Sequence, residues 1–251
     1  MKVVLKLKHC LEAVKLYRND LKQYKQLSLK QGDGLFLYDN KIKMPMLMDR
    51  FRAAGNVDEH YFFQDMYMAR EIFLANPENH YDIGSKLDGF IAHLLSFRES
   101  VTMIDIRPLP YDIRGLKFMQ GNAMELDRIC EDSLESLSSL HAIEHFGLGR
   151  YGDPVNPQAW KIALQAMEKS VKKDGRLYIS VPIGPENRVY FNAHRIFEIH
   201  LIPQSLEQCK LIKFAYIKEG RIVEVPVNEF DDYRIKDNYL CGMYIFEKSD
   251  K

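Results

Sequence analysis

Two polar segments in the second half of the chain hold the side chains best suited to acid–base chemistry. They are residues 144–154 (EHFGLGRYGDP) and residues 184–195. His145 and His194 can act as general bases near neutral pH. Glu144 can orient a histidine or serve as an alternative base.

The same two segments supply polar side chains that can bind a substrate. Glycines and a proline rule out a regular helix in residues 146–154, and polar loops at a strand end are frequently functional. The alternative is that these side chains only hold the loops in shape. The candidates for binding a polar, phosphorylated or sugar-bearing substrate are Arg150, Tyr151, Asp153, Asn192 and Arg195.

A glycine-containing turn farther upstream, residues 82–89 (DIGSKLDG), predicts a site for a nucleotide-like cofactor. Gly84 permits a sharp turn, and the helix that follows directs free N–H groups toward a ligand. Asp105, after the next strand, can accept hydrogen bonds from ribose hydroxyls, and Asn122 can contact an adenine edge. The cofactor-binding candidates are Asp82, Gly84, Ser85, Lys86, Asp105, Asn122, Ala123 and His141.

Lys86 qualifies this prediction, because it occupies the middle position of a G-x-K-x-x-G spacing. A glycine there lets the backbone approach a pyrophosphate, so Lys86 argues against a nicotinamide cofactor. Lys86 can meet a ligand carboxylate, or it can fill the pocket and block it. A strand-to-helix turn without a ligand is the remaining alternative.

One competing motif is H-x-x-E-H at residues 141–145, an inverted zinc-peptidase signature. Zinc would need His141 and His145 on one helical face, together with a third ligand. The segment before the motif has the pattern of a strand, and Gly147 follows at once. A zinc hydrolase is therefore a remote alternative, and no metal is expected.

The elements that position these residues follow from hydrophobic periodicity. Strands separated by helices predict a Rossmann-like, doubly wound, mostly parallel α/β sheet, and the final strands predict an antiparallel edge. Ligands bind such sheets beyond the carboxyl ends of the strands. Strands are expected at 80–84, 101–105, 116–120, 134–140, 176–181, 210–217, 221–225 and 239–247, and helices at 88–97, 123–130 and 158–172.

Residues 1–79 are predicted to form an N-terminal helical section, and residues 80–251 the Rossmann-like domain. The aromatic and methionine side chains of the second predicted helix favour packing over a substrate lid. Helices are expected at 1–30 and 58–75, with a turn at Gly32-Asp33-Gly34 and a stop at Asn76-Pro77.

The first predicted helix is basic and amphipathic, with eight Lys or Arg against Glu12 and Asp20. Such a helix can lie on a membrane surface or dock on a partner. Packing on the protein's own domain is the favoured interpretation. The predicted apolar face contains Leu7, Cys10, Leu11, Val14, Leu21 and Tyr24.

The bulk composition excludes several classes of protein. The 251 residues have a net charge of +0, which gives no electrostatic reason to expect nucleic acid. Four scattered cysteines argue against a disulfide framework or a metal cluster. No stretch resembles a signal peptide or reaches the roughly 18–20 apolar residues of a membrane span. A cytoplasmic protein is expected.

The region from residue 80 to residue 181 resembles the core of class I S-adenosylmethionine-dependent methyltransferases. Asp82-Ile83-Gly84 stands at the glycine-rich first motif, Asp105 at the ribose-binding acid and Asn122-Ala123 at the adenine-side motif. Residues 138–145 and 173–177 resemble the segments around the fourth and fifth strands. Lys86 and Asp88 depart from the pattern, because glycines are common there.

Three strings, HYDIGSKLDGFIAH, EHFGLGRYGDP and FNAHR, resemble the family called domain of unknown function 268. That resemblance implies a methyltransferase-like fold and brings no established reaction. The leading hypothesis is an S-adenosylmethionine-dependent methyltransferase acting on a small polar or saccharide substrate. The alternative is a binding protein that kept the fold without the cofactor or the catalysis.

Overall fold

The computed structural model describes residues 2–31, 38, 39, 41, 44–51, 54, 55 and 57–249. The chain divides into two compact units, Met1–Val57 and Asp58–Lys251. We call them the N-terminal unit and the sheet unit, and both cavities described below lie in the sheet unit.

The N-terminal unit consists mainly of one long helix, α1 (Lys2–Gln31), where a helix was predicted. A short 3-10 turn, η1 (Asp49–Phe51), follows, and Arg50 forms an ion pair of 2.5 Å with Asp20 of α1. On the predicted apolar face, Leu11 and Tyr24 are exposed. The turn predicted at residues 32–34 lies outside the described residues.

The sheet unit is built on one sheet with the strand order β3-β2-β1-β4-β5-β10-β8-β9. Strands β3 to β5 are mutually parallel, whereas β10, β8 and β9 run antiparallel to their neighbours. The predicted doubly wound sheet with an antiparallel edge is therefore confirmed. The strands are β1 (Tyr81–Ile83), β2 (Val101–Asp105), β3 (Leu116–Gln120), β4 (Leu134–Leu140), β5 (Val171–Gly184), β8 (Cys209–Lys218), β9 (Arg221–Val225) and β10 (Leu240–Lys248).

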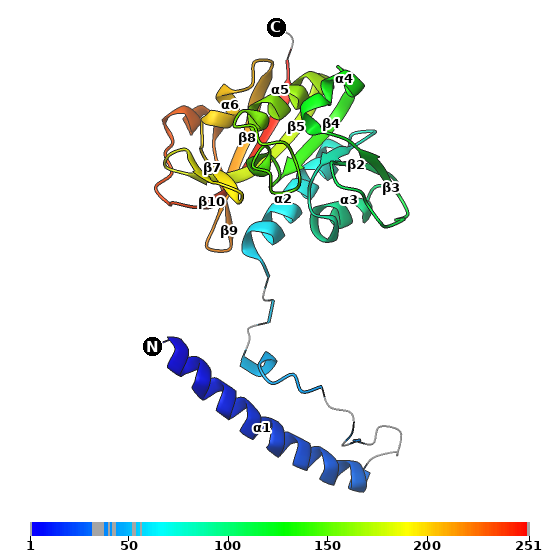
Figure 1. Ribbon diagram of the computed structural model, residues 1–251, viewed down its shortest axis with the longest axis vertical. Coiled ribbons are helices and arrows are strands. Elements are labelled where there is room, and N and C mark those ends of the chain that lie inside the picture. The colour runs from blue at the N-terminus through cyan, green and yellow to red at the C-terminus, as the bar shows by residue number, and fades with distance from the viewer. Residues whose placement is uncertain are drawn as a thin grey trace. The chain divides into compact units, whose positions relative to one another are not determined.

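Helices cover both faces of this sheet (Figure 1). Side chains alternate between faces along a strand, so Leu177 and Ile179 of β5 pack in one core and Tyr178 packs in the other. One core includes side chains of η3 (Ala123–Glu125), α5 (Ala159–Ser170) and α6 (Leu201–Gln204). The opposite core includes side chains of α2 (Glu59–Ala75), the π-helical turn η2 (Leu87–Ile91) and α3 (Ala92–Leu95).

Helix α2 packs with the sheet, so the compact unit begins earlier than the boundary predicted after residue 79. Met68 and Ile72 of α2 are fully buried in one core with Phe90. The helix ends at Ala75, and the capping residue Asn76 has a left-handed φ of 47° while its N–H still bonds to the Ile72 carbonyl. Pro77 then prevents continuation.

Strand β5 begins earlier than predicted, at Val171 rather than at Arg176. The preceding helix was expected to reach residue 172 but ends at Ser170, and residues 173–175 lie within the strand. Asp174 has a φ of 61°, and the pairing of β4 with β5 shifts register between Leu134 and Ser136. The Asp-Gly pair in this irregular strand is a sequence that is typical of a turn.

The segment predicted as a long loop at residues 184–195 contains a hairpin instead. Strands β6 (Arg188–Tyr190) and β7 (His194–Glu198) pair antiparallel, and β7 also pairs with the end of β5. Strands this short leave too few residues for a period-2 pattern to be recognised.

Among the described residues, no helix combines the length and the apolar character that crossing a membrane requires.

Candidate functional site

Two connected cavities lie at the carboxyl ends of the parallel strands. The inner cavity has a volume of about 80 Å³ and is lined by residues that follow β1, β2, β3 and β4. The outer cleft has a volume of about 490 Å³ and reaches α2 and the β6–β7 hairpin. Gly84, Asp105, Arg107, His141, His145 and Tyr151 line both.

The turn after β1 is held by side chains that do not themselves line the inner cavity. Asp82 is fully buried and accepts hydrogen bonds from the Ser85 N–H (3.0 Å), the Ser85 hydroxyl (2.6 Å) and the Ser138 hydroxyl (2.5 Å). The Ser85 hydroxyl oxygen also accepts from the Leu140 N–H (3.1 Å). Asp82 therefore fixes Gly84, whose φ is 69°, between β1 and β4.

The buried carboxyl of Asp82 should make stability depend on pH. Burial raises its pKa from 3.8 to about 6, against the lowering effect of the Ser138 and Ser85 hydrogen bonds. The raised pKa means that the protonated Asp82 stabilises the folded protein. This stabilisation is complete at pH values below the pKa of the unfolded chain, and it is lost as the pH rises through about 6. The measured quantity is the free energy of unfolding of wild type minus that of Asp82→Asn. We expect this difference to be roughly 1–3 kcal/mol larger at about pH 4 than at about pH 7. Urea unfolding at both pH values measures it, and an excess that is constant or grows with pH contradicts the assignment.

Asp105 lines both cavities, and its carboxylate accepts hydrogen bonds from Arg107. The backbone N–H and the Nε of Arg107 donate to Oδ1 (both 2.9 Å), and Nη2 donates to Oδ2 (2.7 Å). The guanidinium also stacks on the Tyr151 ring, 4.5 Å from its centroid. Sequence reasoning missed Arg107, although its position two residues after the acid was a usable signal.

Of the other cofactor candidates, Asn122 and Ala123 line one cavity and Lys86 lines the other. Asn122 and Ala123 line the inner cavity, and Asn122 caps η3 by accepting from the Met124 N–H (3.1 Å). Lys86 lines the outer cleft, where its Nζ lies 4.9 Å from the Tyr61 ring centroid and 3.9 Å from Asp88.

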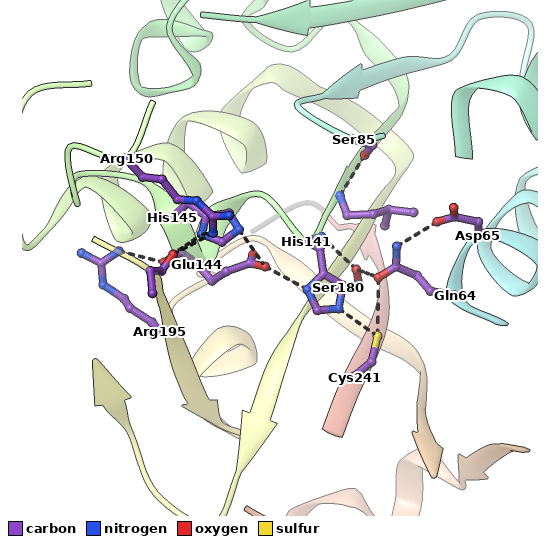
Figure 2. Close-up of polar contacts among 12 residues, drawn as sticks. Gln64, Asp65, Ser85, His141, Glu144, His145, Arg150, Ser180, Arg195 and Cys241 are labelled. Carbon is purple, nitrogen blue, oxygen red and sulfur yellow. Dashed lines mark hydrogen bonds and ion pairs between the residues drawn. The ribbon is translucent and has the colours of Figure 1, made fainter. Parts of the chain in front are cut away.

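Glu144 lies between two histidines in the wall of the outer cleft (Figure 2). Its Oε1 accepts a hydrogen bond from His141 Nδ1 (2.8 Å) and lies 3.5 Å from His145 Nε2. Its Oε2 is buried, and none of the described residues donates to it. A buried acceptor without a donor is costly, which makes this oxygen the least satisfied atom of the cleft wall.

The two histidines differ in charge. Burial lowers the pKa of His141, but Cys241, 3.3 Å from its Nε2, and Glu144 outweigh burial and raise the pKa well above its usual value. Burial lowers the pKa of His145, which Glu144 only partly offsets. His141 is therefore the more readily protonated of the two, and His145 the more readily neutral.

The tautomer of His145 follows from its surroundings. The Ala193 carbonyl accepts from His145 Nδ1 (2.6 Å) and from Arg150 Nη1 (3.1 Å). With Nδ1 protonated, Nε2 of the neutral ring carries the lone pair. His194 lines the same cleft with its ring 5.5 Å from that of Tyr239, and burial lowers its pKa.

Helix α2 completes the polar network behind His141, a contribution that sequence reasoning missed. The Ser180 hydroxyl donates to Gln64 Oε1 (2.5 Å), and Gln64 Nε2 donates to Asp65 Oδ1 (2.9 Å). The His141 N–H in turn donates to Ser180 Oγ (3.1 Å). Nothing local in the sequence pairs these residues, because α2 and β5 meet only in the folded chain.

The predicted substrate-binding residues divide into two groups. Arg150 and Tyr151 line the outer cleft. Arg195 is buried and donates to the carbonyls of Phe146 (2.6 Å), Glu144 (3.3 Å) and Pro157 (3.4 Å), so it holds the loop in shape.

Asp153 and Asn192 also have mainly local roles. Asp153 reaches the inner cavity, but its carboxylate accepts from the N–H groups of Gly147 (2.6 Å) and Tyr151 (3.2 Å). Asn192 is exposed with a φ of 62° in the turn between β6 and β7, and it lines neither cavity.

The geometry does not favour the zinc alternative. His141 precedes the 3-10 turn η4 (Ile143–His145), so His141 and His145 do not share a helical face. In the part of the chain that the structure describes, no three His, Cys, Asp or Glu side chains are arranged to hold a metal ion.

Residues 122–208 match the family described as Caenorhabditis protein of unknown function, DUF268. The resemblance in EHFGLGRYGDP and FNAHR is thereby confirmed. No curated protein matches the chain in sequence.

Two solved methyltransferase structures resemble this one. The 1,6-didemethyltoxoflavin-N1-methyltransferase of Burkholderia thailandensis, bound to 1,6-didemethyltoxoflavin and S-adenosylhomocysteine, is 17% identical with a TM-score of 0.51, over 96% of this chain and 91% of that chain. The N-methyltransferase NodS of Bradyrhizobium japonicum, in complex with S-adenosylhomocysteine, is 10% identical with a TM-score of 0.51, over 82% and 92%. At these identities the likeness shows the fold, which is that of class I methyltransferases.

Proposed function

We propose that the protein is an S-adenosylmethionine-dependent methyltransferase that acts on a small polar or saccharide molecule in the outer cleft. The observation that carries the proposal is the position of Asp105 between the two cavities, with Glu144 and His145 in the wall of the cleft. Such a reaction requires a site for the nucleoside beside a site for the acceptor, and the two cavities adjoin at Asp105.

The side chains around the inner cavity suit the cofactor. The Asp105 carboxylate can accept from ribose hydroxyls, and the apolar walls at Ile104, Met124 and Phe146 suit a purine ring. Lys86, in the adjoining cleft, can meet the carboxylate of the methionine moiety. When bound, S-adenosylmethionine would supply an electrophilic methyl carbon.

The chain's own residues would position the acceptor and remove its proton. His145 Nε2 is the favoured base, because the ring is neutral and oriented by the Ala193 carbonyl. Glu144 is the alternative base, and His194 is a second histidine on the same wall. Arg150 and Tyr151 are placed to contact the rest of the acceptor.

Calorimetric titration with S-adenosylmethionine and S-adenosylhomocysteine tests the proposal. We expect wild type to bind both, and Asp105→Ala to bind them roughly 10- to 100-fold more weakly because charge-assisted hydrogen bonds are lost. Asp112→Ala removes an exposed carboxylate and should bind like wild type. Absence of binding by wild type at millimolar ligand contradicts the proposal.

A cofactor-free binding protein remains the second candidate because of one observation. Arg107 already satisfies both carboxylate oxygens of Asp105. A ligand that needs this carboxylate must share it with Arg107 or displace the guanidinium. The same titration decides between the two candidates.

A further inference from the structure

Among the described residues that line the outer cleft, positive side chains outnumber carboxylates. The charged side chains in its wall are Lys86, Arg107 and Arg150 on one side of the count and Asp105 and Glu144 on the other. Both carboxylates are already engaged, because Asp105 accepts from Arg107 and Glu144 accepts from His141. The positive charges that these pairs leave over are those of Lys86 and Arg150.

Arg150 forms no ion pair with the described residues, whereas Arg107 and Lys86 each lie within 4.0 Å of a carboxylate. The guanidinium of Arg150 lies over the Tyr151 ring, 5.2 Å from its centroid. Its Nη1 donates to the Ala193 carbonyl (3.1 Å). No hydrogen bond from the described residues reaches its Nε or Nη2, so this edge of the guanidinium is left for a ligand.

Arg150 also lies beside the histidines of the cleft (Figure 2). Its Nη1 is 3.2 Å from His145 Nδ1, where both groups converge on one carbonyl. Burial lowers the pKa of His145 and of His194; Glu144 opposes this effect, and the Arg150 charge adds to it. A group that neutralised Arg150 would therefore act on both histidines.

We propose that the acceptor molecule carries an oxyanion, a carboxylate or a phosphate, which binds to Nε and Nη2 of Arg150 beside His145. This inference rests on the proposed function and names the substrate class of the same cleft. The planar guanidinium can bind either group through two parallel hydrogen bonds. A neutral acceptor would leave Arg150 without a counter-charge, and a cationic acceptor would be repelled by Arg150 and Lys86.

The two cations left over in the cleft belong to different parts of the wall. Lys86 follows β1 and lies over the Tyr61 ring of α2, with its Nζ 4.9 Å from the centroid. Arg150 contacts Ala193, in the turn between β6 and β7. Lys86 is the residue proposed above for the carboxylate of the cofactor. Arg150 then remains for an anion of the acceptor, and substitution of each cation separates the two positions.

Four small probes test the inference. Butyrate, monobutyl phosphate, butyramide and butylamine share an apolar tail and differ in the charge of the head group, and butyramide has nearly the shape of butyrate without its charge. Each is titrated at about pH 7 into the full chain with carbon-13-labelled histidine, and NMR follows the ring signals of His145 and His194. Because no cofactor is added, the result does not depend on the calorimetric titration.

We expect an anionic probe to bind and to shift both sets of signals toward the protonated form, because it offsets the charge of Arg150. Butyramide and butylamine should bind about tenfold more weakly or worse. The tighter of the two anions identifies the acceptor as a carboxylic acid or a phosphate ester. Arg150→Gln should weaken anion binding about tenfold. The matched control is Arg188→Gln, which removes an arginine that lines neither cavity and should bind like wild type.

Equal binding of butyramide and butyrate overturns the inference in favour of a neutral acceptor. Loss of anion binding in Lys86→Gln but not in Arg150→Gln also overturns it, because the anion then occupies the position proposed for the cofactor carboxylate. Failure of both anions to bind wild type has the same meaning. The wild-type comparison of butyrate with butyramide suffices if Arg150→Gln fails to fold.

The outcome for the acceptor is distinguishable from the outcome for the cofactor. If S-adenosylmethionine binds in the calorimetric titration and neither anion binds, only the substrate class is wrong. If an anion binds through Arg150 and the cofactor does not, the methyltransferase proposal fails and an anion-binding site remains.

Discussion

Gly147→Ala is expected to destabilise the protein by about 4 kcal/mol or more. Gly147 has a φ of 73°, and a Cβ there would overlap the carbonyl oxygen of Asn156 and lie 2.6 Å from the Cβ of Ala159. Ala159 is the first residue of α5, and the Asn156 carbonyl accepts a hydrogen bond from the Ala159 N–H, so neither neighbour can move without disturbing the start of that helix. The free energy of unfolding from urea denaturation measures the effect.

Gly152→Ala is the matched control for this variant. Gly152 lies in the same loop with a φ of 82°, but nothing lies within 4 Å of the added Cβ. Gly152→Ala should lower the free energy of unfolding by about 1–2 kcal/mol, which is the strain of a non-glycine residue in the left-handed region. Equal losses in the two variants would show that the contact with α5 does not matter.

Arg195→Met has the second largest expected effect, a loss of about 2–4 kcal/mol in the free energy of unfolding. Methionine keeps much of the side-chain volume but cannot donate to the carbonyls of Phe146 and Glu144. These carbonyls belong to the segment that carries His145, so the loop should also loosen. Thermal and urea denaturation measure the loss.

The control is Arg188→Met in the neighbouring strand β6. Arg188 is partly exposed and its main partner is the exposed Glu186, so little change in stability is expected. If Arg195→Met leaves stability unchanged but weakens ligand binding, then Arg195 belongs to the substrate-binding residues after all.

The sequence predicted the central strands closely, because their apolar runs end at clear turn residues. Strands β2, β3 and β4 begin and end where they were expected. The edge of the site was less predictable. Strand β7 is defined by pairing with β5 through Ile183 and Phe197, and such long-range pairing leaves little local signal.

The site could be predicted in position but not in its contacts. The carboxyl ends of the strands brought Asp105, Asn122 and Glu144 to the two cavities, as the topology required. The engagement of Asp105 by Arg107 depends on a side-chain conformation that no spacing rule specifies. The roles of Gln64 and Cys241 behind His141 depend on tertiary packing.

The attachment of α2 to the sheet has a practical consequence for shortening the protein. A chain that began at residue 80 would contain every strand of the sheet but would lose Tyr61 from the cleft wall and Gln64 from behind His141. This shorter chain would also expose the apolar surface that Met68 and Ile72 now cover, and exposed apolar surface promotes aggregation. A chain that began at Asp58 would retain every residue that lines the two cavities, and it is the shorter form to express for crystallisation with ligands.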